Sequence, residues 1–112
     1  MAEVSIAEDL KNKILKKFKE ESKTIFRQMY SLRENPNKGK LVGQVGGIVI
    51  KELKYKSYGF YFITDGYKLK LMDESKLIGL LIRFVRMSDK KDQQKVINEI
   101  KLILRKFGEK SF

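Results

Sequence analysis

The chain has 112 residues, with 25 Lys and Arg against 14 Asp and Glu, a formal net charge of +11, and neither His nor Cys. The missing imidazole excludes a His general base and the Ser-His-Asp and Cys-His pairs of nucleophilic catalysis. The missing thiol excludes disulfides and makes a structural zinc site implausible, so we expect no metal site and no small-molecule cofactor.

Length and composition predict a single domain, 1–112, located in the cytoplasm. Hydrophobic residues make up 42% of the chain, enough to fill one core. The longest apolar run, Leu77–Ile82, is far shorter than the roughly 18 residues that span a bilayer, and the acidic N-terminus does not resemble a signal peptide. The positive charge favours an anionic partner, nucleic acid before a membrane surface, with a merely Lys-rich solvated surface as the alternative.

The first predicted element is one long helix, or two helices with a break near 21–23. Ser5 and Glu8 have the spacing of a capping box, which predicts that the helix begins there. Apolar residues then recur at helical intervals, with lysines between them. The helical pattern ends at Asn35-Pro36, because a residue before proline is pushed out of the α region.

From Leu41 to Met87 the pattern has a period of two and predicts four or five mainly antiparallel strands. Gly46-Gly47 predicts a turn or bulge. Asp65-Gly66 predicts a hairpin between the strands YGFYFIT and YKLKLM, and 73–76 predicts a second turn. The segment LIGLLIRFV is apolar on both faces, which is typical of a central strand.

The last predicted element is a helix that begins near Ser88-Asp89 and ends at a Gly108 cap. The predicted fold class is therefore α+β, with an N-terminal helix or helix pair, a four- to five-stranded mainly antiparallel sheet and a C-terminal helix.

Cations and phenols cluster around the predicted sheet. Cations hold phosphates and aromatic rings stack on unpaired bases, which is the combination that single-stranded RNA recognition uses. The alternative is that the tyrosines pack and the lysines protect strand edges, and we favour packing for Tyr61 and Tyr67. A guanidinium on the central strand must be paired or directed at a ligand. The candidates are Lys54 and Lys56 on one strand face, Arg83 in the central strand, Arg86, Lys90 and Lys91 at its end, Tyr55, Tyr58 and Lys68.

Four segments together resemble the RelE/ParE toxin superfamily, most closely its HigB-like branch. They read LRENPNKGKLVG, IVIKELKY, YGFYFITDG and LLIRFVRMSDKKDQQKVINEI, and the resemblance covers about residues 10–107. It implies a RelE-like fold, cleavage of mRNA on the translating ribosome, and a cognate antitoxin protein as partner.

The resemblance also implies roles for individual residues. Lys54 matches the basic residue of the family's E-L-R segment, and Phe84, Arg86 and Lys90 match its F-x-K-K-x-x-K segment. The chain departs from the family at Gly59, where an Arg is common, in the Met87-Ser88 region, where a His is frequent, and in lacking a Pro after the final Lys.

Metal-independent RNA cleavage needs a proton acceptor for the 2′-hydroxyl, cations around the phosphate and a proton donor to the leaving 5′-oxygen. Our candidates for the acceptor are Lys54 or Lys56, with a pKa depressed by neighbouring cations. Arg83 and Arg86 would hold the phosphate, and Lys90 or Tyr58 would be the donor. Lys56, Tyr55, Lys68 and Lys91 are candidate RNA-binding residues.

Three functions remain open at the level of the sequence. The first is the toxin of a type II toxin–antitoxin system, a ribosome-dependent endoribonuclease. The second is a binding protein on the same scaffold, either a ParE-type topoisomerase inhibitor or a catalytically inert RNA-binding relative. The third is a basic nucleic-acid-binding module unrelated to toxins.

Overall fold

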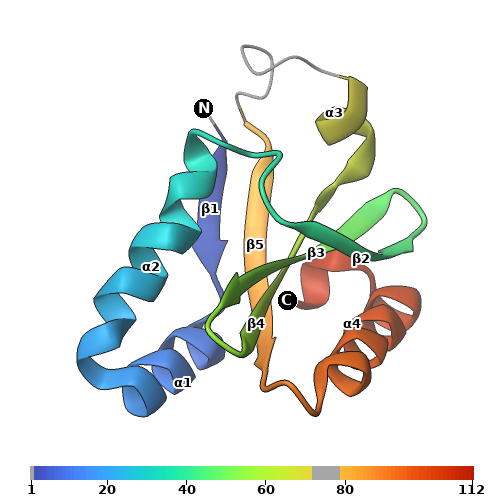
Figure 1. Cartoon of the computed structure of the whole chain (residues 1–112). Helices are drawn as coiled ribbons and strands as arrows, with labels where there is room; N and C mark the ends of the chain where they lie inside the picture. The colour runs from blue at the N-terminus through green and yellow to red at the C-terminus, as the bar shows by residue number, and fades with distance from the viewer. Residues whose placement is uncertain (1, 72–78) are drawn as a thin grey trace.

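The computed structural model describes residues 2–71 and 79–112, which form an α+β fold with one five-stranded sheet (Figure 1). Within these residues, no helix has the length and apolar character that a membrane crossing requires. The elements are β1 (Glu3–Ile6), α1 (Glu8–Phe18), η1 (Lys19–Glu21), α2 (Ser22–Tyr30), η2 (Ser31–Arg33), β2 (Lys40–Val45), β3 (Ile48–Tyr55), β4 (Tyr58–Asp65), α3 (Gly66–Leu71), β5 (Leu81–Ser88), α4 (Gln93–Phe107) and η4 (Glu109–Ser111).

The sheet is mixed, with strand order β1-β5-β4-β3-β2. β1 pairs with β5 in parallel, and the other neighbours are antiparallel. β5 therefore lies inside the sheet, as the apolar segment predicted, although it begins only at Leu81. The hairpin turns are Gly46-Gly47, as predicted, and Lys56-Ser57.

Two helices separated by a 3₁₀ turn precede β2, which resolves the choice between one helix and two. The break is at Lys19–Glu21, slightly earlier than predicted. Ser22 begins α2, and its buried hydroxyl donates to the carbonyl of Ile14 at 3.0 Å. This bond ties α2 back to α1 across the break. The 3₁₀ turn η2 then extends the helical region to Arg33, just before Asn35-Pro36.

β1 was not predicted, and the capping box predicted at Ser5 and Glu8 is wrong. Ser5 lies within β1 in register with Arg83, and its Oγ accepts a hydrogen bond from the guanidinium at 2.9 Å. The helix begins at Glu8 after Ala7, which makes no side-chain cap. Pairing with β5 satisfies the backbone of Glu3–Ile6, so the serine hydroxyl is taken by a partner distant in sequence.

The predicted hairpin at Asp65-Gly66 is also wrong, because the following residues form the short helix α3. The Asp65 carboxylate accepts the backbone N–H groups of Tyr67 at 3.0 Å and Lys68 at 3.1 Å. An aspartate that binds free N–H groups of a first helical turn acts as a helix cap, and this outweighs the alternating pattern of YKLKL. The turn predicted at 73–76 lies outside the described residues.

α4 begins at Gln93, later than predicted, because β5 continues to Ser88. The Asp89 carboxylate accepts the N–H groups of Lys91 and Asp92, both at 3.0 Å, and so holds the loop between strand and helix. Gly108 ends the helix with φ +77°, as the predicted cap requires.

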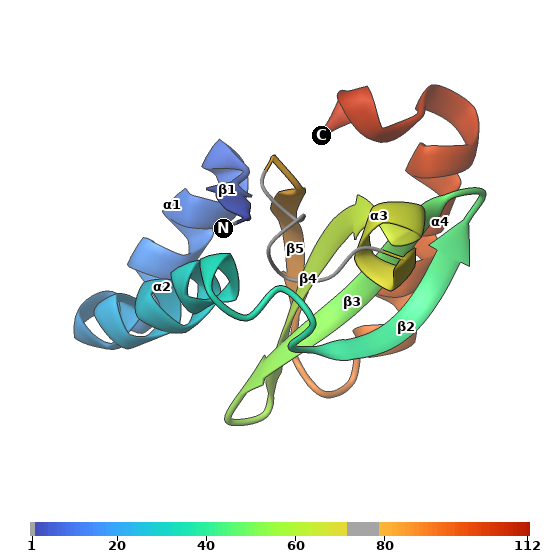
Figure 2. The ribbon, with the colours of Figure 1, turned by 90° about the horizontal axis from the view of Figure 1, so that it is seen from above.

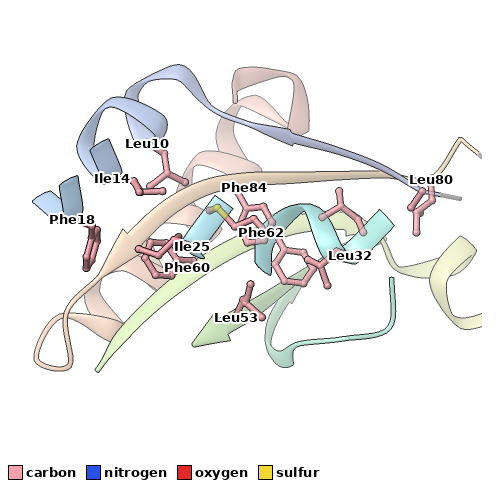
Figure 3. Close-up of a cluster of buried hydrophobic side chains, with 13 residues drawn as sticks. Leu10, Ile14, Phe18, Ile25, Leu32, Leu53, Phe60, Phe62, Leu80 and Phe84 are labelled. Atoms are coloured by element: carbon pink, nitrogen blue, oxygen red, sulfur yellow. The ribbon is translucent and has the colours of Figure 1, made fainter. Parts of the chain in front are cut away.

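Helices cover the sheet on both faces (Figure 2). On one face, α1 and α2 pack against aromatic side chains of β4 and β5. Figure 3 shows Phe18 of α1 beside Phe60, with Phe62 and Phe84 next to each other further along the sheet. On the other face, α4 supplies Ile97, Ile100 and Leu104, which pack against Ile50, Tyr61, Ile63 and Val85. The two cores leave the end of the sheet near the start of α4 free for polar side chains.

Candidate nucleic-acid interface

A groove of about 490 Å³ lies between β2, β3 and the first turn of α4. Its lining includes four lysines, Lys40, Lys54, Lys90 and Lys91. Lys40 and Lys54 come from neighbouring strands, and Lys90 and Lys91 from the loop that Asp89 holds. Four ammonium groups around one concave surface give it a positive potential, which attracts anions.

The floor of the groove includes one carboxylate, that of Glu52, which is 5% exposed. Glu52 is in register with Lys40 on β2 and with Tyr61 on β4, so the three share the sheet face that α4 covers. In the described part of the chain, no cation lies within ion-pairing distance of Glu52. A buried carboxylate without an ion pair is costly in a fold, and it attracts hydrogen-bond donors.

Gly59 provides the space for this carboxylate. A Cβ at Gly59 would lie 2.5 Å from Oε2 of Glu52 and 2.9 Å from the hydroxyl of Tyr61. The Tyr61 hydroxyl also shares a hydrogen bond of 2.8 Å with Oγ of Ser88. Burial raises the pKa of Tyr61 to about 12, and the neighbouring Glu52 carboxylate adds to that shift. The arrangement explains why this position holds no side chain, whereas the family resemblance would place an Arg here.

Gln93, the first residue of α4, adds an amide to the same groove. Its Nε2 is buried and has no acceptor among residues 2–71 and 79–112. The groove walls also include the apolar residues Val42 and Ile97, which belong to the core on the α4 face of the sheet. The groove therefore combines a cationic rim with a carboxylate, a free amide donor and apolar walls.

The structure brings three of the predicted residues together in this groove, namely Lys54, Lys90 and Lys91. Lys54 lies in β3, while the two other lysines come from more than thirty positions later in the chain. The sequence pattern identified them as members of a cationic cluster around the sheet, and their role in RNA binding or cleavage stays a prediction.

Lys56 lies elsewhere, so the expectation that it shares a strand face with Lys54 is wrong. It occupies the β3–β4 turn with φ +56° and forms an ion pair with Glu21 of η1. The hydrogen bond to Glu21 and its negative charge raise the pKa of Lys56. A lysine that accepts a proton needs the opposite shift, which argues against Lys56 in that role. Tyr55 also reaches Glu21, with its hydroxyl 3.4 Å from Oε1.

Tyr58 packs against the N-terminal helices. Its ring lies 5.0 Å from that of Phe18, edge to face, and Nζ of Lys17 lies 5.2 Å from the ring centre. It lines a separate hollow of about 390 Å³, whose lining also includes Lys13 and Lys16. Tyr58 therefore does not reach the groove that holds Lys54.

The two candidate arginines, Arg83 and Arg86, both form hydrogen bonds within the molecule. Arg83 donates to Oγ of Ser5 and to the carbonyl of Phe112, so it is paired, the first of the two outcomes expected for it. Arg86 forms an ion pair with Glu99 at 3.0 Å and stacks at 5.3 Å from the ring of Phe112. Neither arginine lines the groove.

Lys68 belongs to α3 and not to the predicted strand, and it shares a hollow with Arg83 at the far end of β4. Of the two tyrosines expected to pack, Tyr61 is fully buried as expected. The same expectation is wrong for Tyr67, which is 71% exposed at the start of α3.

Lys51 lies on the opposite face of β3 from Lys54. Burial lowers the pKa of Lys51, and its Nζ donates to the carbonyl of Asn37.

Sequence reasoning missed Glu52, Gln93 and Lys40. The alternation in IVIKELKY places Glu52 on the same strand face as Lys54, which was a usable signal. No comparable signal marks Gln93, because its position depends on where α4 begins. In the described residues, no cluster of three or more Asp and Glu side chains offers a metal site.

Comparison of the chain with protein-family models, with curated proteins and with solved structures finds no match. The groove and its residues are therefore the basis on which a function can be assigned.

Proposed function

We propose that the protein binds and cleaves RNA at the lysine-lined groove, as a RelE-like toxin of a type II toxin–antitoxin system that acts on mRNA on the ribosome in the cytoplasm. The observation that carries the proposal is the convergence of Lys40, Lys54, Lys90 and Lys91 on one groove. Four ammonium groups can bind consecutive phosphates of a single strand.

The order of elements supports the RelE-like part of the proposal. A helix pair precedes the four consecutive strands of the antiparallel part of the sheet, the E-L-K segment lies in β3, and the aromatic strand β4 ends at Asp65 before Gly66. β5 then leads through Lys90 and Lys91 into the last helix. The same order underlies the family resemblance of the sequence.

The chemistry can be assigned to residues of the groove. In the chemical step Lys54 first releases its ammonium proton to water, and its amine then accepts the proton of the 2′-hydroxyl. The 2′-oxygen attacks phosphorus, and the P–O5′ bond breaks as Lys90 protonates the leaving oxygen. Lys40 and Lys91 stabilise the charge on the phosphoryl oxygens. Arg83 and Arg86 have no part in this version, because both are bonded inside the molecule.

The test is induced expression followed by mapping of mRNA 5′ ends, and the same mapping on purified mRNA with and without ribosomes. We expect new 5′ ends with the wild-type protein and few or none with Lys54→Ala/Lys90→Ala. The matched control is Lys23→Ala/Lys106→Ala, which removes the same charge from exposed helix positions distant from the groove. Absence of cleavage by the wild-type protein in every condition would exclude the nuclease.

A second candidate function is a nucleic-acid-binding or ParE-type topoisomerase-inhibiting protein on the same scaffold. The internal bonding of Arg83 and Arg86 favours it, because two guanidinium groups expected at a catalytic phosphate are occupied. DNA damage without mRNA cleavage on induction would select the topoisomerase inhibitor. For either candidate, a cognate antitoxin is the proposed protein partner, and co-expression with the product of the adjacent gene should relieve growth arrest.

A further inference from the structure

The groove carries opposite charges at its rim and at its floor, and a ligand that fills it must be compatible with both. Its rim carries four ammonium groups, which select an anion, but its floor holds the buried carboxylate of Glu52, which repels one. The occupant must therefore be negative at the rim and must offer neutral hydrogen-bond donors at the floor. A cationic side chain of a partner protein would fit the floor but not the rim.

A nucleotide has this combination of groups, with an anionic phosphate and a neutral base that carries N–H donors. The apolar residues Val42 and Ile97 on the groove walls suit the faces of a base. The floor thus points to direct contact with a base edge as well as with the sugar-phosphate backbone.

The polar groups on the floor distinguish between the bases. A carboxylate accepts two parallel hydrogen bonds, and guanine alone offers two adjacent donors, N1–H and the N2 amino group, on its Watson–Crick edge. Guanine O6 lies beside N1–H and accepts a hydrogen bond, and the buried Nε2 of Gln93 is a donor without an acceptor in the described chain. Adenine, cytosine and uracil each present one donor group on that edge.

We propose that Glu52 and Gln93 form a guanine-recognition subsite at the floor of the groove, so that the protein selects single-stranded RNA containing guanine. The inference rests on the proposed function, because it requires that RNA enters the groove. Tyr61 and Gly59 are positioning residues: the Tyr61 hydroxyl lies beside the carboxylate, and Gly59 leaves space for it.

The test measures equilibrium binding of labelled nine-nucleotide RNAs, with 2′-fluoro sugars so that no strand is cut. Each is oligo-uridine with a central guanine, inosine, adenine, cytosine or uracil. We expect the wild-type protein to bind the guanine strand between about 5-fold and about 150-fold more tightly than the adenine strand, as expected of one bidentate base contact. Inosine, which lacks the N2 amino group, should be intermediate.

Glu52→Gln keeps the shape of the side chain and an acceptor for Tyr61, but it loses the second strong acceptor. We expect it to abolish most of the guanine preference without weakening the all-uridine strand, because a negative charge leaves the groove. Glu20→Gln, an exposed residue of η1, is the control for the change in charge. Gln93→Ala should reduce the preference less than Glu52→Gln does.

The outcomes separate the two proposals. Equal binding of all five strands, or a guanine preference that survives Glu52→Gln, overturns the subsite and leaves the RNA-binding groove in place if Lys54→Ala still weakens every strand. Failure of the wild-type protein to bind any strand overturns the subsite, whereas the proposed function stands or falls separately on the mapping of mRNA 5′ ends with ribosomes. Thermal unfolding of each variant shows whether a loss of binding reflects a loss of fold.

Discussion

Gly59 is the residue on which the geometry of the candidate site depends most directly. Its missing side chain lets Oε2 of Glu52 and the Tyr61 hydroxyl lie over the β4 backbone. Tyr61 is fully buried and its hydroxyl shares a hydrogen bond with Ser88, so the Tyr61 ring has no open space to move into. A small residue here is therefore a condition for placing a carboxylate at the floor of the groove.

We expect Gly59→Ala to destabilise the protein by about 1 to 3 kcal/mol, the usual cost of inserting an atom into a packed interior. The new Cβ would lie 2.5 Å from Glu52 and 2.9 Å from Tyr61, so both side chains must shift. Gly47→Ala is the control, because its Cβ would meet no atom within 4 Å. The measurement is urea unfolding, and equal stabilities of the two variants would contradict the packing seen around Gly59.

At the scale of elements, the short strand β1 contains Ser5, a residue whose spacing from Glu8 is typical of a helix start. Its four residues add a parallel strand to β5, and Ser5 binds the guanidinium of Arg83 at 2.9 Å. Arg83 also bonds to the carbonyl of Phe112, so the first strand and the end of the described chain meet at one side chain. This arginine therefore stabilises the assembly of elements that are distant in sequence.

Substitutions at Ser5 and Glu8 distinguish this contact from a capping box. We expect Ser5→Ala to cost about 1 to 2 kcal/mol, because the guanidinium loses an acceptor in a partly buried site. Glu8→Ala should cost about 0.5 kcal/mol, the contribution of an exposed acid in a first helical turn. In a double-mutant cycle by urea unfolding, the coupling should be zero within about 0.3 kcal/mol. Similar losses with strong coupling would instead indicate a reciprocal cap.

At the scale of the whole molecule, the charge of +11 is spread over surfaces of different kinds. Four lysines line the groove, whereas Lys56 is neutralised by Glu21 and Arg86 by Glu99. Arg83 is held by the hydroxyl of Ser5 and a main-chain oxygen of Phe112. A net charge of this size therefore overstates how many cations can bind one ligand at one place.

The dependence of RNA binding on salt should report this distribution. Release of counterions from a single strand by four lysines predicts a slope of about −3 for the logarithm of the binding constant against the logarithm of salt concentration. Lys54→Ala should reduce the magnitude of that slope by about 0.7, the share of one phosphate contact. Lys56→Ala should leave it unchanged, because Lys56 is paired with Glu21 outside the groove. Equal effects of the two substitutions would show that RNA binds across the β3–β4 turn instead.

Local patterns in the sequence identified much of the fold and part of the candidate site. Helical periodicity predicted α1, α2 and α4, alternation predicted β2 to β4, and the basic cluster predicted Lys54, Lys90 and Lys91. These features depend on residues close in sequence, whose side-chain directions follow from strand or helix geometry.

Tertiary structure decided the features in which one side chain has two possible partners. Ser5 could cap a helix but binds Arg83, and Asp65 could form a hairpin turn but caps α3. Lys56 could share a face with Lys54 but turns toward Glu21. The sequence by itself determined the periodicity of most helices and strands and the positions of the charges. For Ser5 and Lys56 the choice of partner required contacts between segments far apart in the chain, since the free energy of a hydrogen bond or ion pair depends on which group burial brings within reach.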